Sequence, residues 1–579
     1  MDTRRTILWI IFSVSLFMLY ENWQRATGKP TMFGPPLTTS QPAAPGSAPH
    51  VPTDDVPVAS STPGSVPAGS GAPTANNPAA ATPASDVPSV TAPAKGERIA
   101  VKTDRFAVDF NSIGATIDRV ELTAYRDSAD NAQKFVLLDQ TPGYYYVAQT
   151  GLVGSTAAGA PAVSLPTHRT PFTAVPGPRE MADGQDTLDV SFEATSGGVK
   201  VVKTYTFRRG SYEIGVKHTI TNTGDQPVSP QLYLQLVRDD KAPAGGSHFY
   251  STYYGPAVYS EAEKFQKVSF SDIEKGKGPD KHVARADEGW VAMLQHYFVS
   301  AWIPAAGTRD YYTDKLDANL FRVGLREPLG TIAPGATLDN QANLYLGPTD
   351  ERILETVAPG MDLVRDYGWT TILAKPMFWV LEKIHGAIGN WGWSIILLTI
   401  GIKAIFFPLS AASYKSMARM KNLAPRMKDL QERHKDDRAK LNQATMELYR
   451  TEKINPMGGC LPIVVQIPFF IALYSTLLAS VEMRGAPWLG WIHDLAAPDP
   501  FYILPVIMMA SMFVQYKLNP APPDPTQAKM MLIMPLVFGV TFFFFPAGLV
   551  LYWVVNNLLS IAQQWQITRM LGEKKPKAA

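Results

Sequence analysis

The stretch Trp391-Gly-Trp-Ser-Ile-Ile-Leu-Leu-Thr-Ile-Gly-Ile-Lys403-Ala-Ile-Phe-Phe-Pro408-Leu409 decides how this chain is built. Its length and its almost wholly apolar composition predict a membrane-spanning helix. Lys403 lies about 4–5 Å past the midpoint of that span, at the helical rise of about 1.5 Å per residue. A charge at this depth either snorkels to the nearer headgroups or lines a wet cavity between helices, because an unsolvated charge in lipid is costly.

Four further apolar segments follow, and they predict four more spans over 458–481, 501–516, 530–545 and 547–562. The last two are separated by the turn signal around Pro546-Ala-Gly548, so we expect a tight helical hairpin there. Lys and Arg concentrate between the first two spans, where 413–457 holds eleven of them against six acidic residues. With an N-terminal span added, the positive-inside rule predicts six spans and two cytoplasmic termini.

The N-terminal region predicts a membrane anchor followed by a tether. Residues 1–27 carry Arg4 and Arg5 before an apolar run, as a signal peptide or a signal-anchor does. The segment Glu21-Asn-Trp-Gln-Arg25, directly after the run, offers no small-x-small cleavage site, which favours an uncleaved anchor. Residues 28–96 are rich in Pro, Ala, Ser and Thr, a composition that cannot bury a core and predicts a disordered linker.

Residues 97–347 predict a large exported all-β sandwich. Apolar and polar residues alternate with period two, for example from Phe106 to Phe110, as in antiparallel strands with one buried face. His218 falls on such an apolar face and is either a hydrogen-bonded core histidine, the commoner case, or a catalytic one. Asp239-Asp240 are read as a solvated loop rather than as metal ligands. The absence of a nucleophile elbow, a phosphate loop or a His-x-x-x-His spacing from this region argues against an enzyme.

Two helical regions flank the Lys403 span. Residues 348–390 predict a short helix and an amphipathic helix from Tyr367, which lies on the outer membrane surface or packs as an ordinary domain helix. Residues 413–456 predict a cytoplasmic helical hairpin that turns at 434–437, and this is either a partner-binding element or a self-packed hairpin with a solvated charged face. Its first arm carries an apolar stripe of Met417, Met420, Leu423, Met427 and Leu430.

Composition excludes several classes of function. The single cysteine, Cys460, rules out an intrachain disulfide and a zinc-finger type of site. The net charge of +2 gives no indication of sequence-specific nucleic-acid binding. We therefore expect no cofactor and no metal.

Polar side chains recur within the predicted spans and favour a hydrated cavity around Lys403, since such groups tend to face one another or water. We expect a substrate groove lined by Lys403, Thr399, Gln466, Ser475, Gln515, Trp553 and Asn556.

Four motifs in 370–570 resemble the core of the YidC/Oxa/Alb insertase family. They are Asn390-Trp-Gly-Trp-Ser394 leading to Lys403, Asn455-Pro-Met-Gly-Gly-Cys460 leading to Pro468, Trp491-Ile-His-Asp494 with Tyr502-Ile-Leu-Pro505, and Phe545-Pro-Ala-Gly-Leu-Val-Leu-Tyr552-Trp-Val-Val-Asn556. The anchor, the linker and the exported domain resemble the Gram-negative architecture of this family.

The resemblance implies a membrane protein insertase and folding chaperone of the inner membrane. Such proteins act alone on small nascent membrane proteins and beside the Sec translocon on larger ones, and a ribosome or targeting factor is a further expected partner besides membrane lipids. The family encloses a hydrophilic groove with one positive residue, where Lys403 stands in place of the usual arginine, and Trp553 stands where tyrosine is common. The exported domain resembles a β-supersandwich in the periplasm.

The basic surplus of the hairpin favours ribosomal RNA or acidic partner segments. We expect contacts through Arg426, Lys428, Arg433 and Lys435, with residues 571–579 as a basic C-terminal tail of the five-span core 391–570. Two other functions stay open from the residues alone: a small-solute transporter, which needs internal repeats of its spans, and a membrane-anchored carbohydrate-modifying enzyme, which needs paired carboxylates.

Overall fold

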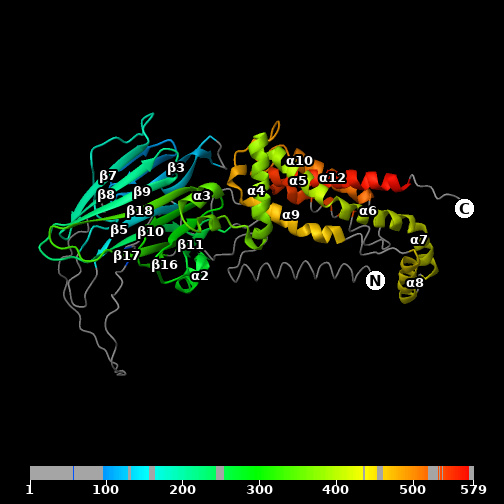
Figure 1. Cartoon of the computed structure of the whole chain (residues 1–579), viewed down its shortest axis with the longest axis horizontal. Helices are drawn as coiled ribbons and strands as arrows, with labels where there is room; N and C mark the ends of the chain where they lie inside the picture. Colours follow the sequence, from blue (N-terminus) through cyan, green and yellow to red (C-terminus); the bar gives the residue numbers. More distant parts are fainter. Residues whose placement is uncertain are drawn as a thin grey trace, which may run out of the picture.

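The computed structural model describes residues 56–57, 96–127, 132–141, 143–154, 164–242, 253–317, 319–434, 437–452, 461–518, 532–533, 535–536 and 539–572. The predicted anchor at 1–27, nearly all of the predicted linker and most of the basic tail lie outside these ranges. An all-β part comes first along the chain, and a helical part follows (Figure 1).

The β part is a sandwich of two antiparallel sheets, which confirms the predicted fold class of this region. One sheet contains, in spatial order, β1 (Arg98–Lys102), β2 (Phe106–Asn111), β3 (Thr116–Arg126), β4 (Lys134–Thr141), β5 (Tyr144–Gly154), β10 (Pro230–Asp239), β17 (Leu320–Pro328), β16 (Arg309–Asp317) and β13 (Arg285–Ala286). The other contains β12 (Lys264–Lys267), β11 (Gly255–Ser260), β14 (Trp290–Leu294), β15 (Phe298–Pro304), β18 (Thr337–Pro348), β9 (Glu213–Asn222), β8 (Val199–Arg208), β7 (Thr187–Ser196) and β6 (Thr173–Ala174).

Lys203 lies buried inside this sandwich. Residues of β8 alternate between buried and half-buried positions, and Lys203 occupies a buried one. Its ammonium donates hydrogen bonds of 2.7 Å to the carbonyl oxygens of Gly114 and Thr150, which belong to the opposite half of the sandwich. Lys203 therefore ties the two halves together through main-chain acceptors, and burial lowers its pKa to about 7.

His218 is a core histidine, as the sequence favoured. It pairs directly with Lys203 across β8 and β9, is fully buried, and its Nε2 lies 2.9 Å from the Thr150 hydroxyl. Burial, assisted by the nearby Lys203 charge, lowers the pKa of His218 to about 3. The imidazole is therefore neutral at pH 7.

The prediction of a solvated loop at Asp239-Asp240 was wrong for Asp239. Asp239 is the last residue of β10 and is buried, and its carboxylate accepts hydrogen bonds from the backbone N–H groups of Tyr145 (3.0 Å) and Lys241 (3.3 Å). The carboxylate satisfies main-chain donors where the strand ends.

The helices of the described residues follow the β part, apart from α2 and the short turn η1 within it. Their bounds are α2 (Phe270–Glu274), α3 (Glu351–Val357), α4 (Thr371–Ile388), α5 (Trp391–Ile405), α6 (Phe407–Asn422), α7 (Ala424–Arg433), α8 (Arg438–Thr451), α9 (Leu461–Ala479), α10 (Ile503–Leu518) and α12 (Ala547–Gly572). Short 3₁₀ turns cover η1 (Pro279–Lys281), η2 (Met361–Val364), η3 (Gly368–Thr370), η5 (Val481–Met483) and η6 (Phe542–Phe544).

The predicted Lys403 span is not one straight helix. α5 ends at Ile405, and α6 begins at Phe407 with a bend of 66° between them. Pro408 explains the break, since its ring lacks an N–H and collides with the carbonyl four residues earlier in a continuous helix. Lys403 consequently lies in the last turn of α5.

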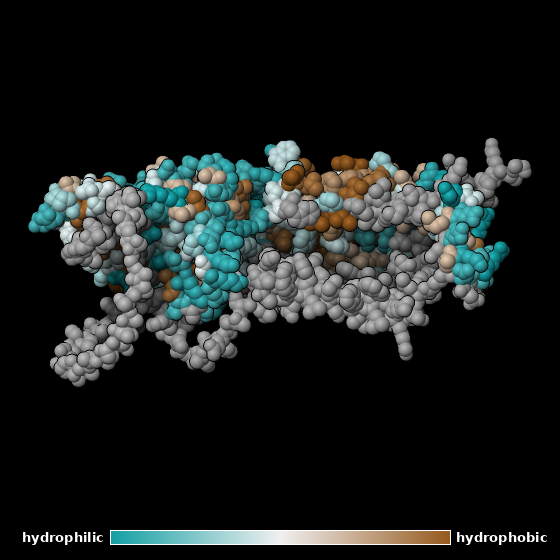
Figure 2. Space-filling model, turned by 90° about the horizontal axis from the view of Figure 1, so that it is seen from below, coloured by the Kyte–Doolittle hydropathy of each residue, from teal (hydrophilic) through white to brown (hydrophobic). Residues whose placement is uncertain are grey.

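Within the described ranges, no single helix combines the length and the hydropathy needed to cross a membrane, whereas α5 and α6 reach both together as a bent pair. Hydrophobic side chains nevertheless gather over the helical part, between the hydrophilic β part and the hydrophilic end formed by α7 and α8 (Figure 2). The count of six spans stays a prediction.

α4 runs crosswise to the long helices, beside the β part (Figure 1). One side packs inward through Ala374, Met377, Phe378 and Leu381, while Ile372 and Trp379 are 85% and 59% exposed. An exposed aromatic and aliphatic side of this kind is typical of a helix in a membrane interface.

Side-chain contacts bind the β part to the helical part. His296, which precedes β15, donates from Nε2 to the carbonyl of Leu478 near the end of α9 at 2.9 Å. The guanidinium of Arg484 donates to the carbonyl of Arg126 at 2.7 Å and lies over the rings of Phe135 and Phe298. Burial lowers the pKa of His296 to about 4, so this histidine is a neutral donor at pH 7.

A buried ion pair joins the segment between α3 and α4 to the loop after α9. Arg365 is bidentate to Glu482 at 2.8 and 3.2 Å, also donates to Ser480 at 2.6 Å, and lies over the ring of Phe378. Removing one partner of a buried pair leaves an uncompensated charge, which makes this junction costly to break.

We predict that His218 makes the β sandwich sensitive to acid. Its pKa of about 3 lies below the value of about 6.5 in an unfolded chain. The contribution of His218 to the free energy of unfolding is therefore fully present above pH 6.5 and is lost as the pH falls toward 3. Between pH 8 and pH 4.5, the free energy of unfolding of the natural protein should fall by about 2–3 kcal/mol more than that of His218→Gln. Denaturation of the full chain, followed by the amide I band of β-sheet, measures both. An identical pH dependence of the two proteins would contradict the prediction.

Candidate functional site

Lys403 is buried between α5 and α12. Its ammonium donates a hydrogen bond of 2.8 Å to the hydroxyl oxygen of Ser560, which in turn donates to the carbonyl of Asn556 at 2.8 Å. Tyr414 on α6 lies close to Ser560. Among the described residues, no carboxylate lies within ion-pairing distance of Lys403. Among those residues, the direct hydrogen-bond partner of the Lys403 ammonium is the neutral hydroxyl of Ser560.

α12 presents a polar side to this lysine. Trp553, Asn556, Ser560 and Gln564 follow one another at spacings of three and four residues, which places them on one side of the helix. On α5, Thr399 precedes Lys403 by one turn and donates to the carbonyl of Ile395 at 2.6 Å. The two helices thus face each other with a short polar strip inside an apolar bundle.

Further polar pairs connect neighbouring helices. Gln515 of α10 donates to the side-chain oxygen of Gln564 at 2.7 Å, and Asn557 donates to Ser511 at 2.7 Å. On the other side of the bundle, Gln466 of α9 donates to Ser410 of α6 at 3.3 Å. Cross-helix hydrogen bonds of this kind satisfy polar groups that lipid cannot solvate.

The remaining residues of the expected groove have less direct geometry. Ser475 is half-buried on α9, one position before the fully buried Thr476, which donates to the carbonyls of Ala472 and Ala374. Trp553 packs edge-on against Phe470 and Phe542, and its buried Nε1 has no partner among the described atoms. The structure joins Lys403 to α12 directly, whereas Gln466 and Gln515 make contacts of their own.

Three hydroxyl residues around this site were not among the predicted groove residues: Ser410, Tyr414 and Ser560. Ser560 follows Asn556 by four residues, so the helical spacing contained the signal. Tyr414 and Ser410 had no such signal, because their approach depends on the bend at Pro408. Among the described residues, no group of three His, Cys, Asp or Glu side chains is placed to hold a metal ion.

The segment of the predicted hairpin, 413–456, contains the C-terminal part of α6 followed by α7 and α8, and its first arm is interrupted at Leu423. α7 and α8 are joined by a turn at His434, and Asp437 caps α8 by accepting from the N–H of Lys440. Arg426 makes an ion pair with Glu452 at 2.5 Å and so has a structural contact of its own, whereas Arg433 is exposed. The side chain of Lys428 and all of Lys435 lie outside the described parts.

Comparisons with known proteins cover nearly the whole chain. The YidC periplasmic domain family matches residues 98–380, and the 60Kd inner membrane protein family matches residues 383–574. The membrane protein insertase YidC of Cupriavidus metallidurans is 55% identical, and the alignment covers 100% of this chain and 99% of that protein. The corresponding insertase of Bordetella parapertussis is 56% identical over 100% of both chains.

A crystal structure of an active YidC insertase, with its first transmembrane domain resolved, covers 81% of this chain and 94% of its own at 18% identity and a TM-score of 0.36. The two family matches and the full-length relatives agree with the motifs around Lys403 and Asn556, and they set aside an enzymatic function. The chain belongs to the YidC family of membrane protein insertases of the inner membrane, with a large periplasmic all-β domain.

Proposed function

We propose that Lys403 is the groove cation that receives the polar tail or loop of a nascent inner-membrane protein. The observation that carries the proposal is the environment of Lys403: the ammonium is buried and bound to Ser560, with no described carboxylate to neutralise it. An acidic substrate tail would supply the missing countercharge. Such an attraction is strong where water is scarce, because the effective dielectric constant is low.

The groove would be lined by Thr399, Lys403, Gln466, Ser475, Gln515, Trp553 and Asn556, to which the geometry adds Ser560 and Tyr414. After the polar tail enters, the apolar segment of the substrate needs an apolar exit into lipid. α9 offers Val465 and Ile467, which are 37% and 45% exposed, and the helical residues around 532–541 offer Leu536 and Val540. We place the exit beside these two helical regions.

We propose six spans with both termini in the cytoplasm, in a multi-pass arrangement. The positive-inside rule supports this orientation, since the basic segment 413–457 lies at the end of the molecule away from the β part. The membrane potential or the hydrophobicity of the substrate segment supplies the drive, because the described residues offer no nucleotide site. The chain serves as a folding chaperone alone or beside the Sec translocon, and the hairpin contacts a ribosome or a targeting factor.

The first prediction of the proposal concerns the groove charge. Lys403→Glu should slow insertion of substrates with acidic tails at least about tenfold, which corresponds to about 1.4 kcal/mol, because it replaces attraction by repulsion. Lys403→Arg should retain most of the activity, because the charge stays. Reconstitution into liposomes with one acidic-tailed and one neutral-tailed substrate measures the two rates.

Ser560→Ala serves as the matched variant, since it removes the hydrogen-bond partner of Lys403 and leaves the charge in place. Its insertion rate should lie between those of Lys403→Arg and Lys403→Glu. Near-native insertion by Lys403→Glu would make Lys403 a bystander that snorkels to the headgroups.

The second prediction concerns the β sandwich, where the described residues contain no catalytic arrangement. Deleting residues 98–349 should leave insertion largely intact, provided that Glu351 and Arg365 remain to support α4 and the loop at Glu482. The control deletion extends to residue 370 and removes Arg365, so it should lower both the yield of folded protein and the insertion rate. A well-folded but inactive first deletion would show that the sandwich has a function in insertion.

The third prediction concerns the hairpin. Replacing Arg426, Lys428, Arg433 and Lys435 by glutamine should slow insertion from ribosome-bound chains at least about twofold without changing the melting temperature of the core, because α7, which carries Arg426 and Arg433, lies beyond the apolar helices. Insertion rate and thermal unfolding are measured on the same purified variant.

The charge-matched control neutralises four exposed basic residues of the β sandwich, which are Lys200, Lys217, Lys264 and Arg285. Equal slowing of both variants would assign the effect to net charge. Replacing Arg426 alone separates the loss of its ion pair with Glu452 from the loss of partner contact.

A further inference from the structure

Arg365 fastens the outer end of α9, which is the end that lies beside the β sandwich. The Arg365 side chain is buried, and its guanidinium donates two hydrogen bonds to the carboxylate of Glu482 and one to the hydroxyl of Ser480. Ser480 directly follows the last residue of α9, and Glu482 lies in the 3₁₀ turn η5 that comes next. Arg365 therefore binds the chain at the point where α9 ends.

A chain of hydrogen bonds extends this contact into α9 and across to α4. The Ser480 hydroxyl, which accepts from Arg365, donates to the carbonyl of Thr476 at 2.6 Å. The Thr476 hydroxyl in turn donates to the carbonyl of Ala374 on α4 at 3.3 Å. The guanidinium also lies over the ring of Phe378 on α4, 3.9 Å from its centre. Arg365 thus contacts α4 through the face of its guanidinium and the end of α9 through its N–H groups.

α9 is at the same time a wall of the proposed groove. Phe470 of α9 packs against Tyr552 and Trp553 of α12, with ring centres 5.4 and 4.3 Å apart. Gln466, nearer the other end of α9, donates to Ser410 of α6. A helix of 19 residues is about 28 Å long, so a tilt of about 5° about one end moves the other end by about 2 Å. The anchoring of the outer end therefore affects how closely α9 approaches α12.

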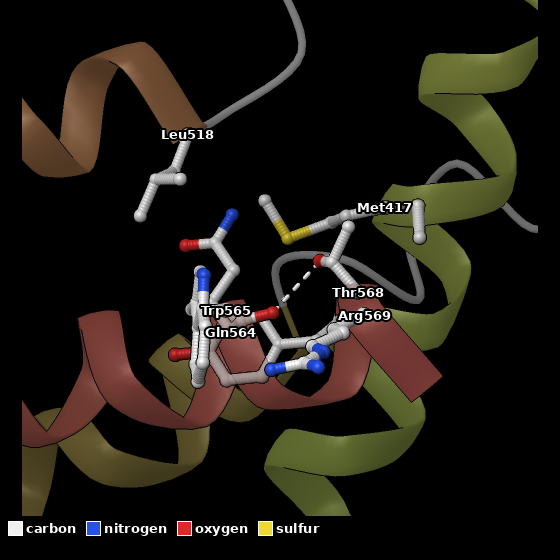
Figure 3. A pocket seen from close by; sticks show the side chains of 8 residues that line it. Met417, Leu518, Gln564, Trp565, Thr568 and Arg569 are labelled. Atoms are coloured by element: carbon white, nitrogen blue, oxygen red, sulfur yellow. Dashed lines mark hydrogen bonds between the residues drawn. The ribbon is translucent and has the colours of Figure 1, made fainter. Parts of the chain in front are cut away.

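The helical part is closely packed at this end and open at the other. The space that Leu477, Leu478 and Met483 help to line, at the outer end of α9, measures about 10 Å³. At the opposite end, α6, α10 and α12 surround a cavity of about 240 Å³, with Met417 and Leu518 on its wall (Figure 3). Closely packed side chains resist displacement, so the fastening by Arg365 lies where the helices have the least room to move.

We propose that Arg365 is a positioning residue for insertion: it holds the outer end of α9 against α4 and thereby sets the distance between α9 and α12. Because Arg365 is buried, it acts through α9 and not on the substrate. An arginine suits this role, since its planar fork of N–H donors binds a carboxylate and a hydroxyl group from one side chain. The inference rests on the proposed groove in taking α9 as one of its walls, and it does not depend on the charge of Lys403.

The test separates positioning from stability with two variants. Arg365→Met alone leaves the Glu482 carboxylate buried without its partner, which lowers stability for a trivial reason. Arg365→Met combined with Glu482→Leu removes both charges and keeps apolar volume, so the melting temperature should rise above that of the single variant. The insertion rate per folded protein should nevertheless stay about fivefold below that of the natural protein. Amide hydrogen exchange of residues 471–484 should also stay faster, because the end of α9 is no longer fastened.

Arg484→Gln is the matched control, because Arg484 lies two residues beyond Glu482 and binds the β sandwich instead of α4. It should insert substrates at the natural rate. Natural insertion by the double variant, or equal slowing by Arg484→Gln, would overturn the proposal. Faster exchange throughout α5, α10 and α12 of the double variant would assign its slow insertion to general instability and would likewise overturn it.

An acidic-tailed and a neutral-tailed substrate distinguish this inference from the proposed role of the groove charge. The double variant should slow both substrates alike, whereas Lys403→Glu should slow mainly the acidic-tailed one. Natural insertion by Lys403→Glu would contradict the role of Lys403 and leave the result for Arg365 unchanged. A double variant that slows only the acidic-tailed substrate would show that Arg365 acts on charge, and would overturn the positioning role.

Discussion

The helical part is organised around one positive charge in an apolar bundle. An ammonium without solvent or countercharge is costly in lipid, so the surrounding helices must offer it oxygen atoms. Ser560 does this directly, and its own hydroxyl returns a hydrogen bond to α12. The requirement fixes which side of α12 faces α5, and the remaining polar pairs on α10 and α12 then fall into register.

The β sandwich also contains a buried lysine ammonium, but it stabilises this group with different acceptors. Lys203 is also buried, but its ammonium donates hydrogen bonds to two carbonyl oxygens of the other half of the sandwich. These fixed acceptors stabilise the ammonium without an anion. Lys403 is bound by one hydroxyl group next to a polar strip. The two buried lysines therefore differ in the number of fixed acceptors: Lys203 has two carbonyl oxygens, and Lys403 has one hydroxyl group.

Much of the architecture followed from patterns that are local in sequence. Period-two alternation predicted the sandwich, and its apolar face placed His218 in the core. The spacing of three and four residues predicted the hairpin of α7 and α8 and its turn. The bend after Ile405 was missed because hydropathy is continuous through Pro408, and a span prediction weighs composition above backbone geometry. Tyr414 and Ser410 approach the site through that bend, so their contacts were hidden in the sequence for the same reason. Asp239 was misjudged since the adjacent Lys241-Ala-Pro suggested solvent, whereas its carboxylate turns inward to backbone donors.

The hydrogen bond between His296 and the carbonyl of Leu478 connects residues that are 182 positions apart. At a synthesis rate of about 5–20 residues per second, the histidine leaves the ribosome roughly 10–35 s before its acceptor does. The sandwich therefore has time to fold on the far side of the membrane before α9 is complete. The end of α9 then contacts the sandwich through His296, and Arg484, a few residues later in the chain, adds a second contact through the carbonyl of Arg126. The contacts between the two parts thus form only after the whole sandwich, which ends with β18, has been synthesised.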